Sequence, residues 1–165
     1  MIFKELLEAS ACATLEELDN LIRDIWLECC GHLSLFRIED ELYFSEPDEN
    51  WEQEDMSIEL DNVLSLKKEF YHEYDFGSTT YLMLKVVSER EGEIKDRSIK
   101  ILARNDSPPI VCSYCDKLAT EICTECLWSG GGWLCDECAK KHKCSREMFL
   151  PVVNSPRTGV CGYTG

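Results

Sequence analysis

The sequence predicts a protein of the α+β class, in which a helix-and-sheet domain precedes a small zinc-binding module. Helical and β-rich stretches follow one another in residues 1–104 without strict alternation, which favours an α+β domain over a series of βαβ units. Consecutive prolines at 108 and 109 then exclude a helix or a central strand. Seven cysteines and one histidine follow within 112–144. We therefore expect four segments: a domain at 1–104, a linker at 105–111, a two-zinc finger module at 112–150 and a turn-rich tail at 151–165.

An amphipathic helix is the first element that the domain sequence predicts. Thr14 and Glu17 form a T-x-x-E capping box, in which each side chain accepts a hydrogen bond from the other residue's backbone N–H. Apolar residues then follow at helical spacing, namely Leu15, Leu18, Leu21, Ile22, Ile25 and Trp26. We expect the helix to continue until near Gly31, because glycine commonly follows a helix C-terminus.

The stretch Cys29-Cys30-Gly31-His32 at the end of this helix has two interpretations. We favour a structural one, in which Gly31 caps the helix and the two cysteines are small buried apolar side chains. The alternative is a reactive cluster. No base or orienting carboxylate accompanies it at a recognisable spacing, which counts against that alternative.

The rest of the domain is predicted to consist of strands, one short helix and polar turns. Residues 33–38 and 41–44 flank an acidic pair, as the two strands of a hairpin do. Residues 45–57 carry six acids without periodicity and predict a solvated loop. The remaining elements that we expect are a short helix at 58–66, strands at 69–75 and 79–87, a polar turn at 91–96 and a strand at 98–103.

This succession of motifs resembles a known family. LEELDNLIRDIW is followed by HLSLFRI, ELYF, LDNVL and FYHEYDFGSTTYLMLKV, and the Tyr-Asp-Phe-Gly step at 74–77 is the most specific of them. Residues 14–104 thereby resemble the plasmid pRiA4b ORF-three-like family, also labelled transposon-passenger TnpR-like. Family members usually continue with Asp-Trp-x-His, where this chain has Ser-Thr-Thr-Tyr at 78–81. The resemblance implies a compact α+β domain without an established activity.

The cysteines of the module have the spacing of zinc ligands. A Cys-x-x-Cys turn directs two thiolates at one ion, and three such turns occur here. With a histidine and one further cysteine they make eight donors, enough for two complete four-ligand sites. The candidate ligands are Cys112, Cys115, Cys123, Cys126, Cys135, Cys138, His142 and Cys144, with Cys161 competing with Cys144 for the eighth position. We expect two zinc ions.

The pairing of these donors stays open at this point. The pattern resembles a B-box-type zinc finger, which implies interleaved sites: one ion would be bound by the cysteines at 112, 115, 135 and 138, and the other by those at 123 and 126 with His142 and one more. A sequential pairing is the alternative. Only Lys143 separates His142 from Cys144, so the chain must bend there if both bind one ion. Glycines at 159 and 162 favour a tight turn around Cys161.

Other uses of these thiols fit the sequence less well. A redox dithiol usually stands alone on a βα unit, whereas three consecutive pairs and a histidine occur here. Closed four-ligand zinc sites leave no open position for catalytic water. An enzyme with a pocket near His72 and Asp75 remains an alternative, although these two side chains would lie on opposite faces of one strand. The sequence therefore favours a non-enzymatic protein.

The charge distribution favours a protein partner over a nucleic acid. The formal net charge is −15, and residues 1–104 carry 25 acids against 11 bases. Such a surface repels phosphate backbones. One basic cluster occurs, at Lys140, Lys141, Lys143 and Arg146, and it keeps nucleic-acid binding linked to mobile elements as an alternative. The sequence lacks a signal-length apolar run, so we expect a cytoplasmic protein without a membrane segment.

Two tryptophans of the module also have two interpretations. Trp128 and Trp133 bracket three glycines at 130–132. We favour indoles that cover the core of the small module, because it has few large apolar side chains. The alternative is that the indoles anchor a partner protein.

Overall fold

The computed structural model describes residues 3–48, 53–92 and 99–165, and it confirms the α+β class. The chain divides into two compact units. We call Glu5–Arg104 the domain and Asn105–Gly165, which contains the cysteine-rich segment, the module unit. Among the described helices, none has the length and apolar character needed to cross a lipid bilayer.

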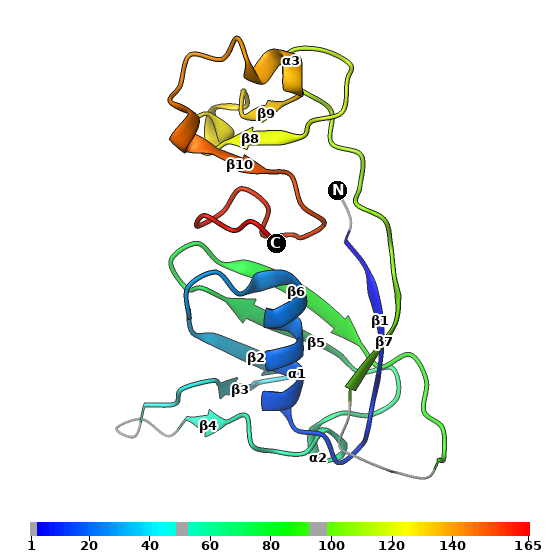
Figure 1. The fold of residues 1–165 in the computed structure, drawn as a ribbon. Coiled ribbons are helices and arrows are strands. Elements are labelled where there is room, and N and C mark those ends of the chain that lie inside the picture. The colour runs from blue at the N-terminus through cyan, green and yellow to red at the C-terminus, as the bar shows by residue number, and fades with distance from the viewer. Residues whose placement is uncertain (1–2, 49–52, 93–98) are drawn as a thin grey trace. The chain divides into compact units, whose positions relative to one another are not determined.

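A five-stranded sheet forms the centre of the domain (Figure 1). Its strand order is β4-β3-β2-β5-β6, and the pairs are antiparallel except that β4 runs parallel to β3. The strands are β2 (Ser34–Ile38), β3 (Glu41–Phe44), β4 (Glu54–Asp55), β5 (Glu69–Tyr74) and β6 (Thr80–Lys85). The predicted hairpin at 33–38 and 41–44 is confirmed, since β2 and β3 pair around Glu39 and Asp40.

Helix α1 (Leu15–Ile22) begins with the predicted capping box. The Glu17 N–H donates to Thr14 Oγ1 over 3.2 Å, and the Thr14 N–H donates to Glu17 Oε2 over 2.8 Å. A π-helical turn, η1 (Arg23–Leu27), continues it and closes with the Glu28 N–H bonded to the Arg23 carbonyl. The expectation that the helix reaches Gly31 is wrong, because the chain is already extended at Glu28.

The domain core lies where α1 packs on the inner face of the sheet. Along β5, Phe70, His72 and Tyr74 are buried, which confirms one of the two rows that strand alternation predicts. Phe36 of β2 lies against this row, with its ring centroid 4.8 Å from that of His72. His72 Nε2 is 2.6 Å from Asp19 Oδ1 of α1, so a buried polar contact joins helix and sheet.

Further elements of the domain differ from the prediction. A two-stranded sheet pairs β1 (Glu5–Ala9) with β7 (Ile99–Arg104), and β1 was not predicted because its residues lack clear alternation. Helix α2 (Leu60–Val63) is shorter than the expected 58–66. The expected loop at 45–57 contains β4, although residues 49–52 lie outside the description. Most of the predicted turn at 91–96 also lies outside the described residues.

The module unit is built on a small three-stranded sheet with the order β10-β8-β9. Its elements are β8 (Glu121–Cys123), the 3₁₀ turn η2 (Leu127–Ser129), β9 (Trp133–Leu134), α3 (Asp136–Ala139), the 3₁₀ turn η3 (Arg146–Met148) and β10 (Phe149–Pro151). The tail packs on this sheet: a Cβ added to Gly159 would lie 2.6 Å from Ile122 Cδ1. Residues 151–165, which we call the strap, therefore pack against β8 at Gly159 rather than extend as a free end.

Candidate metal centres

The first cluster of donors brings together two Cys-x-x-Cys turns that are far apart in the sequence. The four sulfur atoms of Cys112, Cys115, Cys135 and Cys138 lie within 4.8 Å of one another. Cys112 and Cys115 belong to the turn that follows the Pro108-Pro109 segment, whereas Cys135 and Cys138 lie at the start of α3. Backbone bonds align the two parts, since the Ser113 N–H donates to the Trp133 carbonyl over 2.7 Å.

The sulfur separations match a tetrahedral zinc site. Zn–S bonds of about 2.3 Å place two sulfurs of a tetrahedron about 3.8 Å apart. In this cluster Cys115 Sγ lies 3.6 Å from Cys135 Sγ and 3.9 Å from Cys138 Sγ. These distances exceed the roughly 2.05 Å of a disulfide bond, so the thiols are arranged as separate ligands.

The electrostatics of the first cluster favour a bound cation. Burial acts to raise the pKa of Cys112, but backbone N–H groups of Tyr114 and Cys135 outweigh it and lower the pKa to about 6. Hydrogen bonding with Cys135, together with burial, raises the pKa of Cys138 to about 12. Without an ion, the pKa values of Cys112 and Cys135 are lowered while those of Cys115 and Cys138 are raised, because the thiols share hydrogen bonds and cannot all be anionic together. A divalent cation removes this conflict, because it stabilises all four thiolates together.

The second cluster combines three cysteines with a histidine. Ligand atoms of Cys123, Cys126, His142 and Cys144 lie within 4.8 Å of one another. Cys123 ends β8 and Cys126 precedes η2, while the other two lie in the irregular segment after α3. Cys126 Sγ and Cys144 Sγ are 3.6 Å apart, and hydrogen bonding with Cys126 raises the pKa of Cys144 to about 12.

Aromatic contacts hold the histidine of the second cluster. The His142 ring meets Phe149 edge-on, with centroids 5.5 Å apart, and Tyr114 lies at 6.2 Å. His142 Nε2 is buried and has no hydrogen-bond partner among the described residues. A buried nitrogen without a partner is costly unless its lone pair binds an ion, so the residue types and their surroundings fit a metal.

The structure groups the predicted donors in the interleaved order. It places Cys144 beside His142, because α3 ends at Ala139 and the chain bends before both residues, as their spacing requires. Cys161 belongs to neither of the two clusters described above; it is exposed and has a positive φ of 49° in the strap. This grouping favours Cys144 over Cys161, which the sequence left as competing candidates for the eighth ligand.

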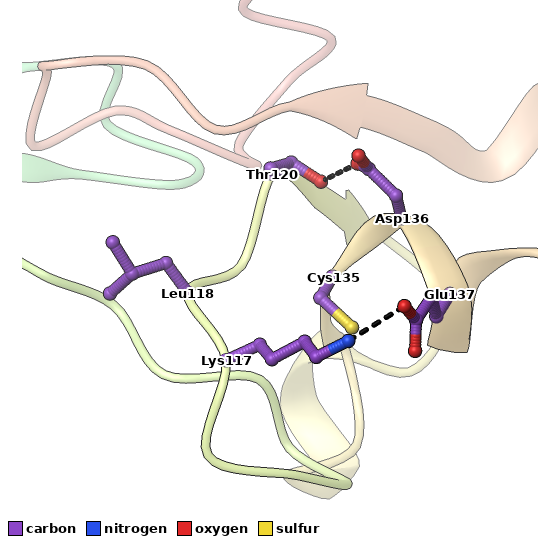
Figure 2. A pocket seen from close by; sticks show the side chains of 6 residues that line it. All are labelled: Lys117, Leu118, Thr120, Cys135, Asp136 and Glu137. Atoms are coloured by element: carbon purple, nitrogen blue, oxygen red, sulfur yellow. Dashed lines mark hydrogen bonds and ion pairs between the residues drawn. The ribbon is translucent and has the colours of Figure 1, made fainter.

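A pocket of about 210 Å³ borders the first cluster (Figure 2). Lys117 and Glu137 lie across it, with Lys117 Nζ 2.7 Å from Glu137 Oε1 beside the Cys135 sulfur. Thr120 Oγ1 donates to Asp136 Oδ1 on another side. The hydrogen bond to Glu137, and less so the nearby thiols, raise the pKa of Lys117, which thus stays cationic. The pocket therefore sets the Lys117 ammonium group next to the Cys135 sulfur.

The preferred interpretation of Trp128 is wrong. This residue is 82% exposed on η2, so its indole does not cover the module core, whereas Trp133 is partly buried on β9. Gly130 has a φ of 84°, and a Cβ on Gly132 would lie 2.6 Å from Leu127 Cα. The glycine loop thus folds tightly against η2, and that leaves Trp128 outside.

The basic cluster of the module is partly neutralised. Arg146 donates from both terminal nitrogens to the two carboxylate oxygens of Glu121, over 3.0 and 2.7 Å, and its guanidinium lies over the Phe149 ring. Lys140, Lys141 and Lys143 are exposed. Arg146 thus serves to fix the start of β10 on β8 instead of adding to a free basic surface.

In the domain, His72 and Asp75 each lie beside a partner other than the one that the sequence analysis considered. His72 contacts Asp19 in the core, whereas Asp75 lies beside His32, with Asp75 Oδ2 3.5 Å from His32 Nε2. Cys29 is partly buried and Cys30 is exposed, so their interpretation as buried apolar side chains is wrong. The reason is the early end of the helix, which leaves both cysteines in a turn at the surface.

Comparison of this chain with protein-family models, with curated proteins and with solved structures finds no match. The resemblance of residues 14–104 to the pRiA4b ORF-three-like family and that of the module to B-box fingers therefore stay predictions.

Proposed function

We propose that residues 112–150 bind two zinc ions and that the resulting rigid module acts as a protein-interaction surface. The observation that carries this proposal is the convergence of eight thiol and imidazole donors into two separate groups of four. Thiolate and imidazole ligands in tetrahedral sets prefer zinc to magnesium or calcium, which bind oxygen. Closed sets of four also suit a structural role more than a catalytic one.

Zinc would be a condition for the folding of the module. One apolar cluster of the module is small and consists of Cys123, Leu134 and Ala139, with other ligand cysteines packed around them. Segments below about 40 residues rarely fold without metal, disulfides or a partner. A Cys₄ zinc site also carries a net negative charge, which the neighbouring Lys117 ammonium offsets in part.

The exposed tryptophan is what supports a protein partner. The turn that carries Trp128 is tied to a ligand, since the Ser129 and Gly131 N–H groups both donate to the Cys126 carbonyl over 3.2 Å. A metal at Cys126 would thereby hold the backbone that presents the indole. Rigid, exposed aromatic side chains are frequent centres of binding energy in protein interfaces. Exposed Tyr114 and Leu118 add apolar area on the same unit.

Two measurements test this function. Native mass spectrometry counts the zinc ions of chain purified under reducing conditions. Affinity capture then compares the wild type with Trp128→Ala, and with Tyr81→Ala as a matched control, because Tyr81 is a similarly exposed aromatic residue of the domain. We expect Trp128→Ala to retain the zinc of the wild type and to lose partners that the control keeps.

Two results would contradict the proposal. If the purified chain holds no zinc at the module and its cysteines are recovered as disulfides, the metal centres are excluded. Partners that bind equally well to zinc-loaded and zinc-depleted chain would exclude the module as the interaction surface. A salt titration with DNA and RNA gives the remaining control, because binding through basic residues must weaken as salt rises.

A further inference from the structure

A third set of metal-ligating side chains lies in the domain, outside the module. The ligand atoms of Cys29, Cys30 and His32 lie within 4.8 Å of one another. Cys29 Sγ and Cys30 Sγ are 3.7 Å apart, close to the edge of about 3.8 Å that two sulfurs have in a tetrahedral zinc site. His32 Nε2 is 3.1 Å from Cys30 Sγ. Three soft donors thus meet within four consecutive residues.

The backbone of this turn explains how the donors meet. Gly31 has a φ of 76°, in the left-handed region that favours glycine, and this reverses the chain between Cys30 and His32. Nothing lies within 4 Å of a Cβ added to Gly31, so the requirement for glycine comes from the backbone conformation and not from crowding. Without this reversal, the side chains of residues 30 and 32 would not face each other.

A hydrogen-bond network fixes the turn from one side. Glu28 Oε1 accepts hydrogen bonds from the Gly31 N–H over 2.5 Å and from the Tyr74 hydroxyl over 3.2 Å. Arg23 donates from Nε and Nη2 to the other oxygen of the same carboxylate. The Tyr74 hydroxyl also lies 3.9 Å from Cys29 Sγ. The turn is therefore held by Arg23 of η1 and by Tyr74 of β5, through Glu28, so its donors are arranged in advance.

A carboxylate approaches the turn from the other side. Asp75 follows β5, is largely buried and has a φ of 62°. Its Oδ1 accepts hydrogen bonds from the Gly77 and Ser78 N–H groups, which leaves Oδ2 directed at His32 Nε2 over 3.5 Å. One imidazole nitrogen thus faces both a thiol and a carboxylate. A cation at this point would stabilise both the thiolate form of Cys30 and the Asp75 carboxylate.

We propose that Cys29, Cys30 and His32 form a third zinc-binding site, independent of the module, with the Asp75 carboxylate next to the imidazole ligand. Two thiolates and one imidazole are a donor set that suits zinc. When zinc binds, the two thiols lose their protons, and the ion then coordinates both sulfurs and the imidazole nitrogen. Cys30 is exposed, and Cys29 and His32 are only partly buried, whereas each module cluster contains buried cysteines. The third ion therefore exchanges with solvent more readily than the module ions.

The test is zinc titration of the full chain under reducing conditions, read by native mass spectrometry. We expect the wild type to bind three ions, of which one is removed first by a weak chelator. Cys29→Ser/Cys30→Ser should lose that ion only. Cys12→Ser is the matched control, since it removes another partly buried thiol of the domain and should keep three ions. Thermal unfolding of each variant checks that the domain is still folded.

Two single substitutions test the site without removing both sulfurs. His32→Gln should also lose the exchangeable ion. Asp75→Asn keeps an acceptor for the Gly77 and Ser78 N–H groups and removes only the charge. Asp75 Oδ2 faces Nε2, the same nitrogen that lies beside Cys30 Sγ, so its charge acts on the ion itself and we expect about tenfold weaker binding of the third ion without it. A variant that loses this ion while its unfolding temperature is unchanged supports the site directly.

Some outcomes would overturn this proposal and leave the module proposal intact. A wild type that saturates at two ions would mean that His32 and Cys30 form a hydrogen-bonded pair and not a metal site. A Cys29→Ser/Cys30→Ser chain that still binds three ions would have the same consequence. Conversely, Cys115→Ser/Cys138→Ser should lose a tightly held ion and keep the exchangeable one, so the two proposals can fail separately.

Discussion

The domain and the module unit bury their chains by different means. The domain core contains large apolar side chains such as Leu15, Leu27, Phe36 and Tyr74, all without solvent exposure. In the module unit, three of the nine buried apolar residues are cysteines, and all three belong to the candidate metal centres. Burial of apolar surface can stabilise the domain without help. The module has little such surface, so we expect its stability to depend on its ligands.

Removal of metal should have the largest effect on stability. We expect this loss of stability to be confined to the module. Structural zinc contributes about 10–16 kcal/mol of apparent binding free energy in small fingers, which is also folding free energy there. With a strong chelator, or in Cys135→Ser, we expect amide hydrogens of 112–151 to exchange rapidly while those of β2 and β5 stay protected. Hydrogen exchange read by mass spectrometry measures both regions in one sample. Equal loss of protection in both would end the distinction between them.

Substitution of Cys144 and of Cys161, the two candidates for the eighth ligand, tests which cysteine completes the second metal centre. In a Cys29→Ser/Cys30→Ser background, which isolates the module, we expect Cys144→Ser to lose one of two zinc ions and Cys161→Ser to keep both. The reason is that Cys144 Sγ lies 3.6 Å from Cys126 Sγ, whereas Cys161 lies in the strap outside this cluster. Native mass spectrometry gives the count. The opposite result would assign the eighth ligand to Cys161.

A cavity in the domain core should have a smaller effect on stability, and this effect should be confined to the domain. Phe36 is fully buried against Phe70 and His72. We expect Phe36→Ala to lower the free energy of unfolding of the domain by about 3–5 kcal/mol, because it removes apolar contacts and leaves a cavity. Urea unfolding followed by far-ultraviolet circular dichroism measures the loss. The zinc content of the module should not change, and a fall in it would show that the two units are coupled in stability.

Sequence patterns were most reliable where the interaction is local. The capping box at Thr14 and the hairpin around Glu39 and Asp40 involve neighbours within a few residues, and both are present as predicted. The end of the first helix was misplaced, because the contacts that stop it come from outside the helix. Glu28 turns away from helical geometry to bind Gly31 and Tyr74, and Tyr74 is 46 residues away.

The difference between local and long-range interactions also explains why the predicted burial of some side chains was wrong. Trp128 was expected to cover the module core, since indoles usually do so in small domains. The ligand cysteines and Leu134 occupy that core, and the tight glycine loop leaves the indole outside. Cys29 and Cys30 were expected to be buried, but a turn held in part by the distant Tyr74 exposes Cys30 and leaves Cys29 only partly buried.

The sequence by itself determined the α+β class and the candidate ligands of the module, apart from the choice between Cys144 and Cys161, because capping, strand alternation and Cys-x-x-Cys spacing are short-range properties of the chain. Only the tertiary structure decided which donors lie together. The pairing of Cys115 with Cys135, and the approach of Asp75 to His32, depend on how separate strands and turns pack. Ligand atoms must converge within a few ångströms of one point, and spacing along a chain does not specify that convergence.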